Sequence, residues 1–490
     1  MEPSIAGFLI CTLLFAFAWF SEAPIIVALM ASLAFGSTEI VTLSALGGSS
    51  PLIYVVFLMG LFATVALRRN IVGELGTVFA RQPMAWVVVL LILYTVAGAL
   101  LLPRLFEGQT MTFVPVRAGG GSGRIAEVPL APVTGNITQS LYFVLTALSF
   151  FAFSVLLLQR KTLSAIRTGF FTWASLHAGL GYIDLLGKAS GAGDVLEPAR
   201  SASYAMLTNV DVAGFWRIAG GYSEASAFGA MTVSLLAFSF TYWKRTDDRY
   251  ALVLSLALAL LLVLSTSSTA YLAGALLLMF VIGSIVTSAV HDRLRTHDLL
   301  VLAAAIAVLV IGFGLALHDA RTLEPFSNLF DSMILNKATS ESGTERAYWN
   351  MRSLESVIDT VGLGIGIGSS RASSWIIAVV SQLGVIGTLL MGWLTVEILR
   401  GVGARPSRQE DVKNFATADS ARTACLAGLV TASISSGDAD PGLRFYIALA
   451  AILCCREISR ETFLAGARTS LRTPMPATHA PGALYSERPT

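Results

Sequence analysis

Apolar runs of membrane-spanning length recur along the whole chain, separated by short polar or glycine-containing segments. A transmembrane helix needs about 20 predominantly apolar residues. The pattern therefore predicts an all-α, polytopic integral membrane protein with about 12–13 transmembrane helices. The first two runs are short and fit either a hairpin or one bent unit. The predicted spans lie near residues 5–20, 23–40, 51–67, 84–102, 137–158, 168–187, 222–243, 250–265, 269–289, 299–317, 373–399, 421–436 and 442–456.

Composition supports this class. Of the 490 residues, 55% are hydrophobic and 13% are charged, against about 25% charged residues in soluble domains. The formal net charge is only +2 and no block of basic residues is present, so nucleic acid is not an expected partner. All four cysteines fall within predicted spans, which favours buried free thiols. The five histidines have no zinc-type spacing, and we expect neither a metal nor a cofactor.

Basic residues in short loops indicate the orientation, because such loops mark the cytoplasmic side. When the spans are alternated, the basic loops all fall on one side. They contain Arg68, Arg69, Arg81, Arg160, Lys161, Arg167, Lys244, Arg245, Arg249, Arg293, Arg295 and the segment 400–422. The same alternation places residues 103–136, 188–221, 318–372 and 437–441 outside.

The chain divides into a polytopic membrane domain at 1–456 and a cytoplasmic, partly disordered tail at 457–490. Within the membrane domain, residues 103–136 alternate apolar and polar positions around a glycine-rich turn, which predicts a small β-hairpin lid. Residues 318–372 form the longest external loop, with helices expected near 326–336 and 344–358. Loops of this length in compact proteins are usually functional or disordered.

The segment from Arg217 to Glu224 is the first candidate site. Gly220 and Gly221 lie between the two charged residues and permit a tight turn where the chain enters the next span. Arg217 can bind an anion there, beside the helix N-terminus, and Glu224 can act as a base or orient Arg217. The alternative is an interfacial anchor, with Trp216 and Arg217 at the level of the lipid head groups.

Arginines of the long external loop form the second candidate site. Arg346 and Arg352 lie on a predicted helix, where pairing of Arg346 with Asn350 and of Arg352 with Glu355 would make an ordinary solvated face. Arg371 is the stronger candidate, since it follows a glycine-rich turn and precedes a long apolar helix.

Two further motifs have simpler interpretations. The repeated glycines of Gly362–Gly368 resemble a nucleotide loop only weakly, and a backbone nest for a phosphate or a sugar is the remaining functional interpretation. Asp438 and Asp440 stand among glycines and a proline, which favours a turn over a metal-binding pair.

These segments resemble one family. Arg217-Ile-Ala-Gly-Gly-Tyr-Ser-Glu-Ala-Ser, the Leu264-Ser-Thr-Ser-Ser turn, and Gly362-Leu-Gly-Ile-Gly with Arg371-Ala-Ser-Ser are similar to the O-antigen ligase and Wzy-type polysaccharide polymerase superfamily. The segment from Pro129 to Gln139 is similar to its exopolysaccharide polymerase branch. The resemblance covers roughly residues 50–455.

The resemblance implies a GT-C-like helical fold and a metal-independent glycosyltransferase. Such an enzyme transfers a glycan from undecaprenyl pyrophosphate to an acceptor hydroxyl at the periplasmic side of the bacterial inner (cytoplasmic) membrane. Carried over to this chain, Arg217, Arg371 and Arg346 would bind the pyrophosphate. Because preorganised arginine stabilises the charge of the leaving group and a base assists the acceptor hydroxyl, Glu224 and Glu345 are the candidate catalytic residues.

Two departures favour a polymerase over a ligase. Ligases of the superfamily typically have a histidine near the end of the long external loop, where this chain has Ser369-Ser370-Arg371. They also commonly have an arginine in the serine-rich turn, where this chain has Ser267-Ser268-Thr269. A polymerase would act on an undecaprenyl-pyrophosphate-linked oligosaccharide among membrane lipids, with a chain-length regulator and export machinery as further partners.

Two alternatives stay open. One is an O-antigen-type ligase that transfers glycan to a lipid or protein acceptor. The other, from a different class, is a flippase or transporter of the lipid-linked oligosaccharide. A flippase predicts ionisable residues deep inside several spans. Here the spans are nearly charge-free and the candidate arginines gather at one face, which favours a one-sided enzyme.

Overall fold

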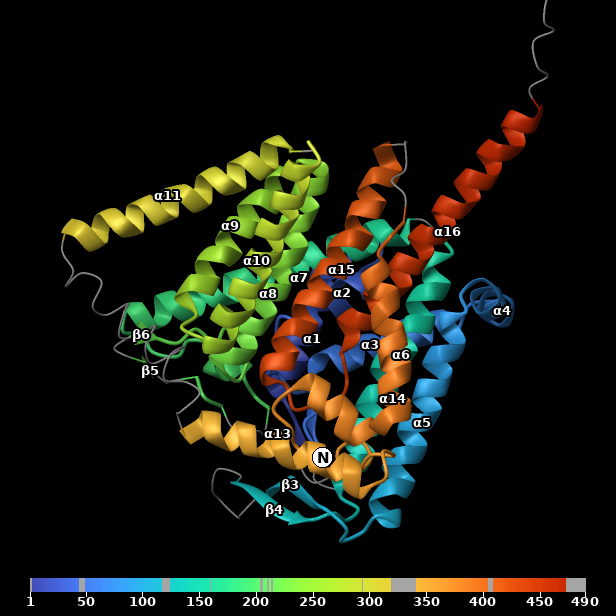
Figure 1. Ribbon diagram of the computed structural model, residues 1–490, viewed down its shortest axis with the longest axis vertical. Helices are drawn as coiled ribbons and strands as arrows, with labels where there is room; N and C mark the ends of the chain where they lie inside the picture. The colour runs from blue at the N-terminus through green and yellow to red at the C-terminus, as the bar shows by residue number, and fades with distance from the viewer. Residues whose placement is uncertain are drawn as a thin grey trace, which may run out of the picture.

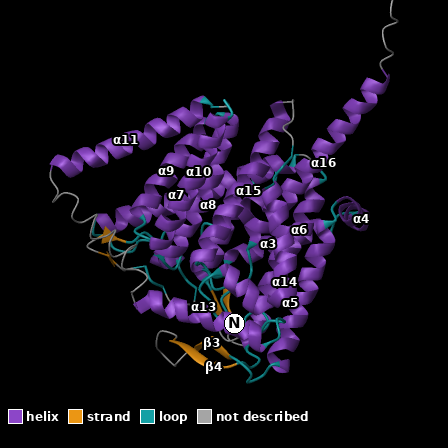
Figure 2. Ribbon diagram, in the orientation of Figure 1, coloured by secondary structure: helices purple, strands orange, loops and turns teal. Residues whose placement is uncertain are grey.

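The computed structural model describes residues 2–43, 49–116, 124–159, 161–202, 206–208, 211–212, 215–292, 294–318, 341–403 and 409–472. In these ranges the chain is mostly α-helical, with three two-stranded antiparallel sheets (Figures 1 and 2). The predicted class is thus confirmed: this is an all-α, polytopic membrane protein.

Five helices in the described residues are long and apolar enough to cross a membrane on their own. A sixth span is possible if α3 (Ile53–Ala66) and α4 (Ile71–Arg81) count as one broken span, although the chain bends by 101° between them. The five are α5 (Met84–Leu105), α6 (Thr134–Leu157), α8 (Ala225–Thr246), α10 (Ser268–Val290) and α14 (Trp375–Arg400).

This number is smaller than the 12–13 spans predicted from apolar runs, for three structural reasons. Helices α1 (Ile5–Ala18) and α9 (Arg249–Leu264), and the stretch Thr296–Ala307 of α11 (Thr296–His318), are apolar but shorter than a typical span. Helix α2 (Pro24–Ser32) has only nine residues, and its side chains from Ile26 onward are buried in the bundle. The remaining helices contain polar or charged residues or extend beyond the predicted runs. They are α7 (Thr162–Ala189), α15 (Gln409–Ser435) and α16 (Leu443–Arg472).

The core forms where these helices pack against each other. Helix α8 lies against α9 and α15, α16 lies against α6 and α15, and the buried α2 lies against α7. Large aromatic side chains such as Trp173, Phe228 and Tyr446 fill the interior and are less than 2% exposed. Helix α11 extends away from the rest of the bundle (Figure 1).

One end of the bundle carries the β3–β4 hairpin and α13 (Glu341–Asp359), and we call it the hairpin end (Figure 1). Strand β3 (Met111–Val116) pairs with β4 (Arg124–Pro129) in antiparallel register, as the alternating pattern predicted. Helix α13 confirms the helix predicted near 344–358. The connection from α10 to α11 and the C-terminal end of α16 lie at the opposite end.

The remaining elements are short. The tail predicted from residue 457 begins as a continuation of α16, which ends at Arg472. The helix predicted near 326–336 and the residues after 472 lie outside the described residues. The short elements are β1 (Glu2–Pro3) paired with β2 (Val41–Thr42), β5 (Asp211–Val212) paired with β6 (Phe215–Trp216), and the 3₁₀ turn η2 (Glu197–Ala199).

Candidate functional site

A carboxylate of α7 accepts hydrogen bonds from the turn that follows Arg217. Asp184 Oδ2 accepts the backbone N–H groups of Ala219 at 2.7 Å and of Gly220 at 3.1 Å. Lys188, one helical turn after Asp184, donates to the backbone carbonyl of Arg217 at 2.8 Å. The predicted tight turn is therefore present, and α7 fixes its position.

Asp184 belongs to a buried network of four charges. Its carboxylate pairs with Lys188 at 3.1 Å and with Arg200 at 3.2 Å. Arg200 also pairs with Asp194 at 2.5 Å and donates from Nε to the carbonyl of Gly220 at 2.8 Å. The two cations and two carboxylates satisfy one another, so Arg200 stabilises the turn and is not free to bind a ligand.

The Arg217 side chain differs from that of Arg200. It is half-buried, and its Nε has no hydrogen-bond partner in the described part of the chain. Burial lowers the pKa of the Arg217 guanidinium; the negative charge of Glu224 opposes this shift, and the positive charge of Arg346 adds to it. The structure thus brings together three of the predicted site residues: Arg217, Glu224 and Arg346.

Arg346 lies on α13, which crosses the hairpin end (Figure 1). It is half-buried and forms no ion pair with any described carboxylate. Arg352, further along the same helix, is paired with Glu355 at 2.8 Å and with Glu127 of β4 at 3.3 Å. The solvated-face interpretation is thus confirmed for Arg352. For Arg346 it stays a prediction: the described residues show no hydrogen bond from Arg346 to Asn350, whose side-chain oxygen accepts the N–H of Ser373 at 2.8 Å.

Arg371 lies between the hairpin and α14. Its backbone N–H donates to the carbonyl of Phe113 in β3 at 2.9 Å, and its guanidinium carbon lies 5.8 Å from the ring centroid of Trp349 on α13. The side chain is exposed, and its charge acts on the carboxyl group of Asp438. Arg371 therefore contacts α13 at Trp349, which follows Arg346 by three residues on that helix.

Glu345 is an exposed residue of α13 and forms no ion pair with Arg217 or Arg371 in the described structure. Glu224 is half-buried, and its Oε1 accepts the hydroxyl of Ser226 at 2.5 Å. Of the two carboxylates predicted as catalytic, only Glu224 lies within electrostatic range of Arg217.

The glycine loop before Arg371, Gly362–Gly368, has a structural role. Its N–H groups donate within the protein: Ile365 to Ser381 O at 3.0 Å, Gly366 to Gln382 O at 3.0 Å, and Gly368 to Gln382 Oε1 at 3.0 Å. The first two acceptors are available because α14 is broken at Gly384 (φ 61°, ψ −166°). These N–H groups are occupied, so the predicted phosphate nest is not formed by them.

Of two polar groups at this end, Arg444 was missed from the sequence, and Asp440 was predicted only as part of a turn. Arg444, in the first turn of α16, is half-buried and donates to Ser234 Oγ at 2.5 Å. Asp440, in the loop before α16, accepts the hydroxyl of Thr146 at 2.9 Å and the N–H of Gly442 at 2.8 Å. Burial raises the pKa of Asp440 to about 7 against these two hydrogen bonds. The position of Arg444 inside an apolar run was the signal that would have identified it.

The turn predicted at Asp438 and Asp440 is present. Within the described ranges, no group of three or more His, Cys, Asp or Glu side chains is arranged to hold a metal ion. No protein-family model matches the chain, and a search of the curated proteins finds no match. Function is therefore inferred from the fold and from this cluster of side chains.

The chemistry of the cluster is that of an anion site. Arg217 and Arg346 lie within electrostatic range of each other, and Arg371 contacts the helix of Arg346 at Trp349. No described carboxylate forms an ion pair with any of the three. Like charges that repel each other at a partly buried site are stabilised by a bound anion. Arginine offers two parallel N–H donors that match phosphate or carboxylate oxygens.

Proposed function

We propose that this protein is a polymerase of a secreted or capsular polysaccharide. It transfers the growing glycan from undecaprenyl pyrophosphate to the next lipid-linked repeat unit at the outer face of the bacterial inner membrane. The observation that supports this proposal most directly is the half-buried Arg217, whose Nε has no hydrogen-bond partner among the described residues and whose guanidinium is within electrostatic range of a second cation, Arg346.

In this proposal Arg217, Arg346 and Arg371 bind the two phosphates of the donor lipid. The acceptor hydroxyl oxygen forms a bond to the anomeric carbon of the growing glycan while the bond from that carbon to the phosphate oxygen breaks. The pyrophosphate keeps the bonding electrons, and the arginines stabilise the negative charge that develops on it. Glu224 accepts the proton of the acceptor hydroxyl, and the released product is undecaprenyl pyrophosphate.

The arrangement of charges along the bundle supports a site on the outer face. The short basic loops, such as the one before Arg249, lie at the end opposite the hairpin, and basic loops favour the cytoplasm. We therefore assign the hairpin end to the periplasm, where the proposed lipid-linked repeat units would be presented. A chain-length regulator and export machinery would be reached from the same side.

The first test is the glycan pool of cells that lack the protein. Single repeat units on undecaprenyl pyrophosphate at the outer face are the result expected for a polymerase. Full-length polymer still attached to its lipid would contradict the proposal and indicate a ligase. Repeat units trapped at the inner face would contradict it and indicate a flippase.

The second test assigns the site. Arg217→Ala and Arg371→Ala should abolish polymer in complemented cells while the protein stays inserted and folded, and lysine at either position should restore little, because it lacks the planar pair of donors. On α13, Arg346→Ala should reduce polymer strongly, whereas Arg352→Ala should change it little, since its salt bridges are exposed to solvent and contribute little. Full activity in both the Arg217 and Arg371 alanine variants would refute the site assignment.

A further inference from the structure

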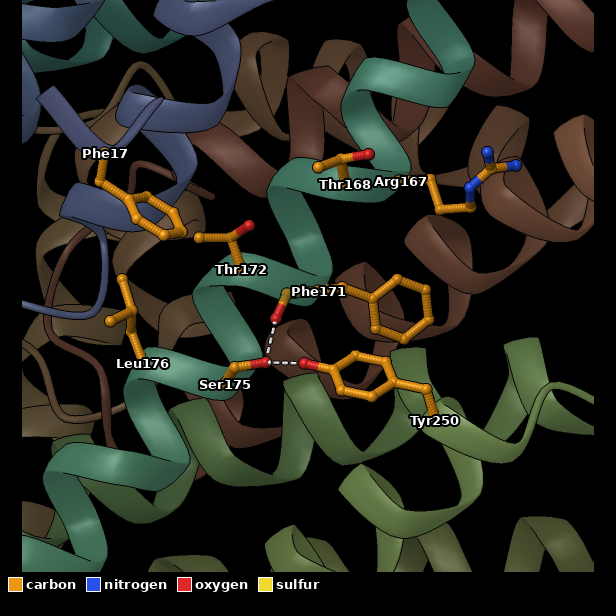
Figure 3. Close-up of a pocket in the computed structure, with 8 residues that line it drawn as sticks. All are labelled: Phe17, Arg167, Thr168, Phe171, Thr172, Ser175, Leu176 and Tyr250. Atoms are coloured by element: carbon orange, nitrogen blue, oxygen red, sulfur yellow. Dashed lines mark hydrogen bonds between the residues drawn. The ribbon is translucent and has the colours of Figure 1, made fainter. Parts of the chain in front are cut away.

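A groove of 390 Å³ runs along the surface of α7, between α1 and α9 (Figure 3). Its floor is one face of α7, because Arg167, Thr168, Thr172 and Ser175 recur at helical spacing. Figure 3 shows Phe17 of α1 on one side of α7 and Tyr250 of α9 on the other. The volume is within the range of roughly 300–1,000 Å³ typical of ligand sites.

The groove is remote from the candidate active site. Helix α6 begins next to the hairpin, so its C-terminal end and the following N-terminal part of α7 lie at the opposite end of the bundle. Tyr250 is in the first turn of α9, which follows α8 at that same end. A ligand in this groove therefore belongs to the other membrane surface.

Arg167 supplies a cation to the groove. It is half-buried, and no carboxylate in the described ranges forms an ion pair with it. Its NH2 group donates to Ser164 Oγ at 3.1 Å, and its side chain also hydrogen-bonds Tyr242. A guanidinium has five N–H donors, so donors remain for an anion. A charged side chain next to the hydrocarbon region usually has a partner. A bound anion would be that partner for Arg167.

Hydroxyl groups that follow Arg167 along α7 are also available to hydrogen-bond a ligand. In helices, Ser and Thr hydroxyls often bond the carbonyl one turn earlier, as Ser175 does by donating to Phe171 O at 2.6 Å. Ser175 also hydrogen-bonds the Tyr250 hydroxyl at 2.5 Å across the groove. The side-chain hydroxyls of Thr168 and Thr172 make no hydrogen bond within the described chain, although both residues line the groove. They can donate to ligand oxygens.

Two apolar ridges lead away from the groove along the flanking helices. Each ridge is one helix face, since its members are three or four residues apart, and each is more than half exposed. On α1 the ridge is Leu9, Leu13 and Phe17, and on α9 it is Tyr250, Val253, Leu256, Leu260 and Val263. A ligand with a polar head in the groove can therefore lay hydrocarbon chains on both sides of α7.

We propose that this groove binds an anionic glycerophospholipid. Its phosphate lies against Arg167, oxygens of the head group and glycerol accept from Thr168 and Thr172, and its two acyl chains follow the ridges on α1 and α9. The charge around the groove fits this ligand, because Lys161 and Arg249, both exposed, begin the flanking helical segments. Basic residues next to the bilayer surface attract anionic lipids.

The test uses the full-length protein in an uncharged detergent and native mass spectrometry. Phosphatidylglycerol and phosphatidylcholine with identical acyl chains are compared as probes. We expect phosphatidylglycerol to bind about ten-fold more tightly, and Arg167→Gln to remove about ten-fold or more of that affinity, as expected for the loss of a charge-assisted contact. Arg69→Gln, which removes an exposed arginine between α3 and α4 that does not line the groove, is the matched control and should change binding less than two-fold.

A second variant protects the test against misfolding, since Arg167 also contacts Tyr242. Thr172→Trp fills the groove without changing its charge and should also lower phosphatidylglycerol binding. Equal binding of the two lipids, or wild-type binding by both Arg167→Gln and Thr172→Trp, would overturn the proposal. Equally strong binding of soluble glycerol phosphate would overturn the role of the apolar ridges and identify a free phosphate as the ligand. None of these results depends on polymerase activity.

Discussion

Replacement of Gly368 by alanine tests the close backbone contact between Gly368 and Gly135, which helps to position Arg371. Gly368 has a φ of +79°, and a Cβ atom built on it would lie 2.2 Å from the backbone oxygen of Gly135. That is more than an ångström shorter than van der Waals contact, and the obstacle is backbone that cannot rotate away. Gly108 provides a matched control, because its φ is +74° but a Cβ atom there would meet nothing within 4 Å.

Comparison of the two variants separates the energetic cost of a left-handed backbone conformation from the cost of the steric clash. Both place an L-residue in the left-handed region, at a cost of about 1–2 kcal/mol. Only Gly368→Ala must also push apart the N-terminus of α6 and the glycine loop, and overpacking of this kind costs roughly 1–3 kcal/mol. We therefore expect destabilisation of about 1–2 kcal/mol for Gly108→Ala and roughly 2–5 kcal/mol for Gly368→Ala.

The assay is thermal unfolding of the two purified variants in the same detergent, followed by tryptophan fluorescence. Gly368→Ala should lower the midpoint about twice as far as Gly108→Ala or more, as the two ranges above require. In complemented cells it should also reduce polymer more, since Arg371 is three residues away. Equal midpoints for the two variants would show that the close backbone approach does not contribute, and would refute the reasoning.

Three further predictions concern single polar side chains. Asp184→Asn should destabilise the protein by about 3–5 kcal/mol, because it leaves Lys188 buried without its carboxylate; an unchanged unfolding midpoint would contradict this. Burial raises the pKa of Asp440 from 3.8 to about 7, so the folded state holds a proton that the unfolded state releases. Stability should therefore fall as pH rises from 4 to 7, and Asp440→Asn should flatten this midpoint-against-pH profile; identical slopes would count against it. Asn136→Ala should cost about 1–3 kcal/mol in thermal unfolding, since the amide donates to Ile367 O at 2.8 Å; a shift no larger than for an exposed asparagine substitution would refute that.

Local patterns carried much of the prediction. The alternation between Met111 and Pro129 predicted a hairpin because strand periodicity is a property of neighbouring residues. Arg217 and Glu224 came together because one tight turn connects them. Helix α13 was also predicted from a local pattern, the helical spacing of its charged residues.

Features that depend on packing were not accessible. The run at 23–40 predicted a span, but its helix α2 is buried among other helices. A protein interior and a bilayer are both apolar, so hydropathy alone does not separate them. The approach of Arg346 to Arg217 depends on where α13 crosses the bundle, and nothing in either segment encodes that contact by itself.

The buried charges below the Arg217 turn have a consequence for biogenesis. Asp184 and Lys188 are one turn apart on α7 and neutralise each other within that helix. Arg200 and Asp194 likewise form a pair within one short segment. Each segment can thus enter or cross the membrane as a neutral unit during synthesis, and the contact between Asp184 and Arg200 forms only after both have arrived. Local pairing of these four charges therefore lowers the cost of moving them into or across the bilayer.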